Sequence, residues 1–141
     1  MIDGKFDSSV CHMQTYYKSP EWKLNPPEFY SVPLLYKIDD RKFDMNIGGW
    51  PVTADPTRRM KLGQMINFYR NVEMHHFSYV RKDIRAKLYN SSAKTNWSNR
   101  IEEIASYYDN WTPGKKALLA GKEERYYDLV KTDNYFNINI S

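Results

Sequence analysis

The chain has almost no cysteine and no long apolar run. Cys11 is the only cysteine among 141 residues, which excludes an internal disulfide and a zinc site made of several thiolates. No apolar run approaches the roughly 18 residues that a membrane-spanning helix needs, and the segment 1–7 lacks the basic and then apolar pattern of a secretory signal. We therefore expect no transmembrane segment.

Motifs that bind nucleotides or metals are also missing. The segment 47–50 contains two glycines but lacks the glycine spacing and the strand-to-helix context of a dinucleotide loop. His75 and His76 are neighbours, and on a helix neighbouring side chains diverge by about 100°, so the two cannot bind one metal ion together. Cys11 and His12 would need further ligands from elsewhere in the chain. We expect no metal site and no cofactor.

Acidic residues do not form a catalytic arrangement either. The pairs at 102–103 and 123–124 are adjacent glutamates, which point apart on a helix and are typical of a solvated face. No histidine lies in the setting of a general base next to a serine, cysteine or threonine. The sequence therefore predicts a non-catalytic protein with no catalytic residue.

Aromatic and basic residues are what the chain has in quantity. It contains 12 Tyr and 4 Trp, its formal net charge is +4, and its mean hydropathy is −0.77. Few aliphatic residues mean that little area would be buried per residue, so the ordering entropy is hard to offset without outside contacts. This composition favours a chain that is stabilised by partners.

The segment 1–54 is punctuated by proline and has no persistent 3.6-residue period. Proline sets neighbouring backbone toward extended conformations, and large aromatic side chains lie between the prolines. Because disordered segments are poor in such residues, we expect an extended arm that docks on another surface.

A helical hairpin is expected at 55–112. Asp55 and Pro56 are a good N-cap and first helical residue, and apolar residues from Leu62 to Leu88 recur at three- and four-residue intervals. This pattern predicts a helix at about 56–89. A second helix at about 99–112 begins at a capping-box-like Asn99 and Glu102 and stops at the segment 112–114, Thr-Pro-Gly. Its apolar face is expected to consist of Ile101, Ile104, Ala105, Tyr108 and Trp111.

The remainder, 113–141, is expected to be a short helix at 115–120 followed by an extended tail. The segment 134–141 alternates polar and apolar residues, which fits a short edge strand or a docking segment. The predicted fold class is therefore mainly α, a helical hairpin flanked by long extended N- and C-terminal arms.

Two sets of residues are candidates for contact with partners. Large rigid aromatic side chains dominate binding energy where they become buried, and the interface candidates are Trp22, Tyr30, Tyr36, Trp50, Trp97 and Trp111. The predicted first helix is rich in cations, and the candidates for contact with an anionic partner are Arg58, Arg59, Arg81, Lys82 and Arg85. Such cations fit a solvated helix face, a protein or anionic lipid surface, or a phosphate backbone.

Several segments resemble a known family. The segments 39–43 (DDRKF), 55–58 (DPTR) and 66–70 (INFYR), with Trp97 and Trp111 further on, resemble the subunit VIb family of mitochondrial cytochrome c oxidase. The resemblance implies a small helical hairpin that caps the oxidase on its intermembrane-space side without taking part in its chemistry. The paired cysteines that define the family are absent here, which removes the disulfide staple.

These observations give two functional hypotheses. The first is a structural accessory subunit of a large multiprotein assembly, a mitochondrial respiratory-chain complex, located peripherally at the inner membrane, whose partners are other subunits and anionic lipid. The second is a basic structural protein associated with nucleic acid, of the ribosomal or virion type.

Overall fold

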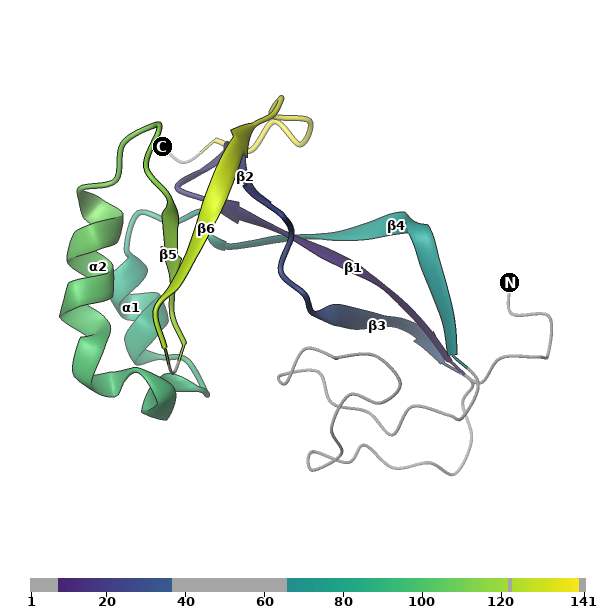
Figure 1. The fold of residues 1–141 in the computed structure, drawn as a ribbon, viewed down its shortest axis with the longest axis horizontal. Helices are drawn as coiled ribbons and strands as arrows, with labels where there is room; N and C mark the ends of the chain where they lie inside the picture. Colours follow the sequence, from purple (N-terminus) through teal and green to yellow (C-terminus); the bar gives the residue numbers. More distant parts are fainter. Residues whose placement is uncertain (1–7, 37–65, 122, 140–141) are drawn as a thin grey trace. The chain divides into compact units, whose positions relative to one another are not determined.

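The computed structural model describes residues 8–36, 66–121 and 123–139 (Figure 1). These residues form six strands, two short α-helices and two 3-10 turns. The strands are β1 (Ser8–Tyr17), β2 (Ser19–Asn25), β3 (Ser31–Tyr36), β4 (Ile66–Tyr79), β5 (Ala117–Leu119) and β6 (Arg125–Lys131), and the helices are α1 (Ile84–Tyr89) and α2 (Ile101–Asp109). The 3-10 turns η1 (Lys94–Asn96) and η2 (Ser98–Arg100) connect the helices.

The prediction of a mainly α fold is wrong. Residues 66–79, which we expected inside a helix at 56–89, form the strand β4, and only Ile84–Tyr89 of that range is helical among the described residues. The expected helix start at Asp55 lies outside the described residues. Within β4, exposed Glu73 and His75 alternate with half-buried Met74 and His76, which is the two-residue period of a strand.

The reason for this difference is tertiary. β4 is rich in aromatic residues, which favour strands, and it pairs with β1, more than 50 positions earlier in the chain. That partner cannot be inferred from the spacing of apolar residues inside 66–79. The three- and four-residue spacing of these residues is therefore coincidental in β4.

The second predicted helix is confirmed. α2 lies within 99–112 and buries Ile101, Ile104, Ala105 and Tyr108, which are residues of the apolar face that the sequence predicts. The predicted capping box does not form, because the N-cap is Arg100 and it makes no side-chain capping bond. The helix is next to α1 and β5 (Figure 1).

The remaining predicted segments differ from expectation. The short helix at 115–120 is replaced by the strand β5, and the charged stretch after it forms β6. The described part of the tail, 134–139, contains no strand, and the Asn134 side chain there bonds the backbone N–H and C=O of Ile138 in a turn. The N-terminal segment contributes β1, β2 and β3 to a sheet, so its extended residues belong to the fold itself.

The sheet order is β3-β1-β2-β6-β5, with β4 also paired to β1. β1 pairs with β2 and β3, and β6 pairs with β2 and β5, all antiparallel, with Leu24 opposite Leu129 and Leu118 opposite Tyr126. The chain divides into two compact units. Unit 1 comprises 1–14 and 28–75, and unit 2 comprises 15–27 and 76–141, so β1 and β4 contribute residues to both.

The two units differ in the size of their described cores. In unit 2 a cluster of 14 buried apolar residues joins α1, α2 and the inner residues of the sheet. In unit 1 the described cluster consists of Cys11, Met13 and Val32, with Tyr30 and Met74 packed against it. Because apolar burial is the main favourable term in folding, unit 2 contains most of the stabilising contacts that the structure describes.

Candidate interaction surfaces

Three of the four tryptophans lie in the core of unit 2. Trp97 and Trp111 are buried, and Trp22 packs against the same cluster. The Trp22 and Trp111 rings meet edge to face, with centroids 5.6 Å apart, and the Trp111 indole N–H donates to the carbonyl oxygen of Lys115 at 3.0 Å. These side chains pack inside unit 2 and stabilise it.

The other aromatic candidates belong to unit 1 or lie outside the described residues. Tyr30 is half-buried, and its ring lies 4.3 Å from that of Phe29, which is 62% exposed. Tyr36 is the last residue of β3, where its backbone is opposite Ser8. Trp50 lies outside the described residues. Of the six, Tyr30 is the one whose described side chain borders an exposed apolar neighbour in unit 1.

The arginine and lysine candidates separate into two kinds. Arg85 of α1 bonds two carboxylates of α2, those of Asp109 and of Glu102, the latter at 3.0 Å. These hydrogen bonds raise the pKa of Arg85, and the bond to Asp109 has the larger effect. This charge is already compensated. Arg81 and Lys82 are exposed, and neither forms an ion pair in the described parts of the chain. Arg58 and Arg59 lie outside those parts.

A tyrosine network that the sequence analysis missed connects α2 to the end of β4. The Tyr108 hydroxyl shares its proton between the carbonyl oxygens of Tyr79, at 2.8 Å, and Arg81, at 2.9 Å, and accepts the backbone N–H of Arg81. The Tyr79 hydroxyl accepts the backbone N–H of Ala120 at 2.7 Å. Burial raises the pKa of both Tyr17 and Tyr108. The signal available in the sequence was Tyr108 itself, at an apolar position of the predicted second helix.

Unit 1 exposes large apolar side chains. The four that the structure describes are Phe29, Leu34, Leu35 and Val72, which we call the unit 1 apolar set. Leu34 and Leu35 are consecutive in β3, and Leu35 is 51% exposed. The pairing of β3 with β1 is irregular at Leu34, because Leu35 is opposite Ser9 and Pro33 is opposite Val10. Leu34 and Leu35 are therefore consecutive exposed apolar side chains at a bulge. No charged residue interrupts the strand sequence SVPLLY.

Metal and membrane sites are not apparent in the described ranges. Residues 8–36, 66–121 and 123–139 contain no group of three or more His, Cys, Asp or Glu side chains that could hold an ion. Within the same ranges, no helix has the length and apolarity required to cross a membrane. His12 is exposed and contacts the Phe68 ring edge to face at 4.6 Å, an arrangement that needs no ligand.

Comparisons with protein-family models, with curated proteins and with solved structures found no match. The resemblance to cytochrome c oxidase subunit VIb implied a helical hairpin, and the strand at β4 contradicts it. The mitochondrial and respiratory-chain assignment stays a prediction from the sequence.

Proposed function

We propose that this protein is a non-catalytic structural subunit that binds other proteins of a multiprotein assembly through the unit 1 apolar set. The observation that carries the proposal is the contrast within unit 1, where three apolar residues form the described buried cluster and four large ones are exposed. The respiratory-chain location is not part of the proposal.

The physical argument concerns the cost of leaving this surface in water. Burying a large apolar side chain contributes about 1.5–3 kcal/mol, and the central part of a protein interface is depleted of charge and enriched in large apolar residues. Phe29, Leu34 and Leu35 lie close together in the chain on either side of Tyr30, which already packs on the cluster of unit 1. A partner that covers them gains this free energy without having to unfold unit 2.

The test is isolation of the native complex from the source cells with a tagged chain. Leu34→Ser combined with Leu35→Ser should remove the stoichiometric protein partners, because both side chains are exposed and the substitution leaves the buried cluster intact. Tyr126→Ser is the matched control, since Tyr126 is an exposed aromatic residue on a strand of unit 2. Circular dichroism melts should establish that both variants are folded.

Two results would contradict the proposal. One is a wild-type chain that is isolated without any stoichiometric protein partner. The other is a complex of unchanged composition in the Leu34 and Leu35 double variant. Recovery of anionic lipid in place of protein, lost in the double variant, would assign the apolar set to a membrane surface and would also reject the proposal.

A further inference from the structure

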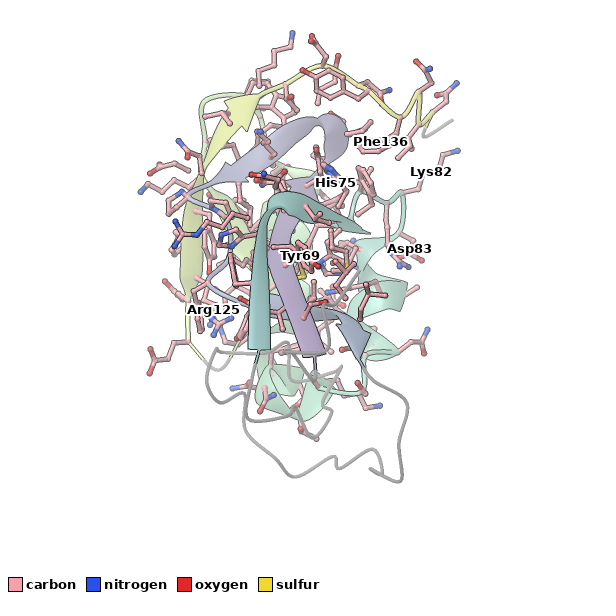
Figure 2. All side chains as sticks on the ribbon, turned by 90° about the vertical axis from the view of Figure 1, so that its right-hand side faces the viewer. Tyr69, His75, Lys82, Asp83, Arg125 and Phe136 are labelled. Atoms are coloured by element: carbon pink, nitrogen blue, oxygen red, sulfur yellow. The ribbon has the colours of Figure 1, made fainter. Side chains whose placement is uncertain are left out.

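A second surface, on unit 2, combines unpaired cations with exposed aromatic rings. The loop between β4 and α1 contains Arg81 and Lys82, both exposed. The Arg81 guanidinium bonds the carbonyl oxygen of Ser78 at 3.1 Å, so it is held in place while its charge stays uncompensated. Figure 2 shows Lys82 extending outward from the ribbon on the side where Phe136 is labelled.

Lys18 adds a third cation next to this loop. It occupies the turn between β1 and β2 with a positive φ of 68°, and its backbone N–H donates to the carbonyl oxygen of Tyr79 at 2.9 Å. Its ammonium lies 4.1 Å from the centroid of the Tyr108 ring, and the hydroxyl of that ring bonds the backbone of Arg81. Lys18 and the Arg81 backbone therefore contact the same tyrosine side chain, Lys18 over the ring face and Arg81 at the hydroxyl.

Three other cations of unit 2 have carboxylate partners, which these three lack. Arg85, Arg100 and Lys116 each form an ion pair with at least one carboxylate. Asp83, the carboxylate nearest to Lys82 in the chain, accepts the backbone N–H of Ala86 at the N-cap of α1. Lys18, Arg81 and Lys82 are therefore three cations around one tyrosine side chain and its loop that have no carboxylate partner among the described residues, as Lys94, Lys115 and Lys131 also have none.

The aromatic part of the surface begins where β4 ends. Phe77 stacks on Tyr16 with ring centroids 4.6 Å apart, and Phe136 packs edge to face on Phe77 at 5.5 Å. Phe136 is 46% exposed and Tyr135 is 70% exposed. The turn that carries them is fixed by the bonds between the Asn134 side chain and Ile138, so the two rings are presented in an ordered conformation.

A binding surface for single-stranded nucleic acid combines two components. Aromatic rings stack on the bases, and neighbouring cations neutralise the phosphates. An acidic peptide would use the cations but gain little from two exposed rings. A duplex would engage the cations alone, because its bases are already stacked. The combination of Phe136 and Tyr135 with the cations therefore favours a single strand over an acidic peptide or a duplex.

We infer that unit 2 binds single-stranded nucleic acid on this basic-aromatic surface, with phosphates on Lys18, Arg81 and Lys82 and bases on Tyr135 and Phe136. The inference is independent of the proposed function, because it uses residues of unit 2 and the apolar set belongs to unit 1.

The experiment is a fluorescence anisotropy titration of the full chain with labelled oligothymidine and oligouridine over a range of salt concentrations. The affinity of the wild type should fall as the salt concentration rises. The double variant Arg81→Gln and Lys82→Gln should bind about tenfold more weakly at low salt. Its slope of log affinity against log salt concentration should be smaller by roughly 0.7 for each lost phosphate contact. Phe136→Ser should weaken binding about tenfold and leave the salt slope unchanged, since stacking on one base is lost.

Two matched controls lie elsewhere on unit 2. Lys116→Gln removes a cation that is paired with Asp128, and Tyr126→Ser removes an aromatic side chain that is 44% exposed, close to the value for Phe136. Both should bind like the wild type, and circular dichroism should establish that all variants are folded. Absence of binding, equal losses in the controls, or equal affinity for the duplex would overturn the inference. Binding to phosphatidylserine vesicles that disappears in the same variants, without binding to the oligonucleotides, would overturn it as well.

Discussion

At the residue scale, Tyr108 has the largest structural role among the polar side chains of unit 2. Its ring is buried in the core, where it meets Tyr17 edge to face at 5.2 Å, and its hydroxyl bonds the backbone at Tyr79 and Arg81. A single side chain of α2 thereby fixes the end of β4 and the start of the loop that precedes α1. The position of the loop therefore depends in part on this hydroxyl.

Replacement of Tyr108 by phenylalanine should lower the free energy of unfolding by about 1–3 kcal/mol, because the Arg81 backbone loses its bonds to the hydroxyl while the ring still fills its space. The Tyr79 carbonyl oxygen keeps the backbone N–H of Lys18 as its donor. Urea denaturation followed by far-ultraviolet circular dichroism measures this change. Tyr126→Phe, which alters an exposed tyrosine, should have little effect. Equal stability of the Tyr108 variant and the wild type would show that the hydroxyl is not needed.

The buried tyrosines also predict how stability depends on pH. Burial raises the pKa of Tyr17 and Tyr108 above the ordinary value of 10.0, so the unfolded chain releases these protons at a lower pH than the folded chain does. The stabilisation is therefore complete below about pH 10 and is lost as pH rises through the folded-state values. We expect cooperative alkaline unfolding.

Absorbance of tyrosinate in the near ultraviolet, recorded with circular dichroism, measures this transition. The tyrosinate signal of the buried residues should appear together with the loss of structure. In Tyr17→Phe, the pH dependence of unfolding above pH 10 should be shallower, because one proton fewer is released on unfolding. An unchanged dependence in both Tyr17→Phe and Tyr108→Phe would contradict this account.

At the element scale, α2 is the helix that the sequence predicts correctly. Its apolar residues are spaced three and four apart, and that spacing alone determines which side of a helix is buried. α1 is too short to show this pattern clearly, and it is held to α2 by Leu88 and Ile84 in the shared core and by Arg85 at the surface. The helix pair therefore depends mainly on apolar packing, since exposed ion pairs contribute little.

Substitution of Ile104 by alanine should test this dependence. Ile104 is fully buried in the middle of α2, and removing a buried aliphatic side chain costs about 2–5 kcal/mol, depending on how far the cavity collapses. Ser106→Ala, on the exposed face of the same helix, should stay within about 0.5 kcal/mol of the wild type. Chemical denaturation measures both, and similar values for the two variants would mean that α2 does not pack as described.

β4 is the element on which sequence reasoning failed, and the reason is general. A strand is stabilised by hydrogen bonds to another strand, and here that strand is β1. Local spacing contains no information about such a distant partner. The apolar residues of β4 could therefore be assigned to a helical stripe, even though Phe77 stacks on Tyr16 of β1 in the structure.

At the scale of the whole molecule, the described core is concentrated in unit 2. The composition led us to expect a chain that is stabilised by partners, whereas unit 2 contains a cluster of 14 buried apolar residues of its own. Tyrosine and tryptophan provide much of that core, including Tyr17, Trp97 and Trp111. Low aliphatic content was therefore a poor measure of how much apolar area the chain buries.

Tryptophan fluorescence of the isolated chain should reveal this folded core. In Trp50→Phe, the remaining emission comes from Trp22, Trp97 and Trp111, all in unit 2. Quenching by iodide should be weak in buffer and should rise several-fold in concentrated urea, because unfolding exposes the indole rings. Strong quenching already in buffer would show that these tryptophans are exposed until a partner covers them.

The sequence by itself determined the features that depend on local chemistry. It determined the apolar face of α2 through residue spacing, the end of that helix before Thr112 through the proline and glycine that follow, and the cationic character of Arg81 and Lys82. The tertiary structure decided which of these features are available to a ligand. Arg85 is neutralised by carboxylates of α2, Trp97 and Trp111 are buried, and Trp22 packs against the same core. Arg81, Lys82 and the leucines of β3, Leu34 and Leu35, stay exposed. The physical reason is that availability depends on which distant residues fold against a side chain, and β-sheet pairing brings together residues that no local pattern connects.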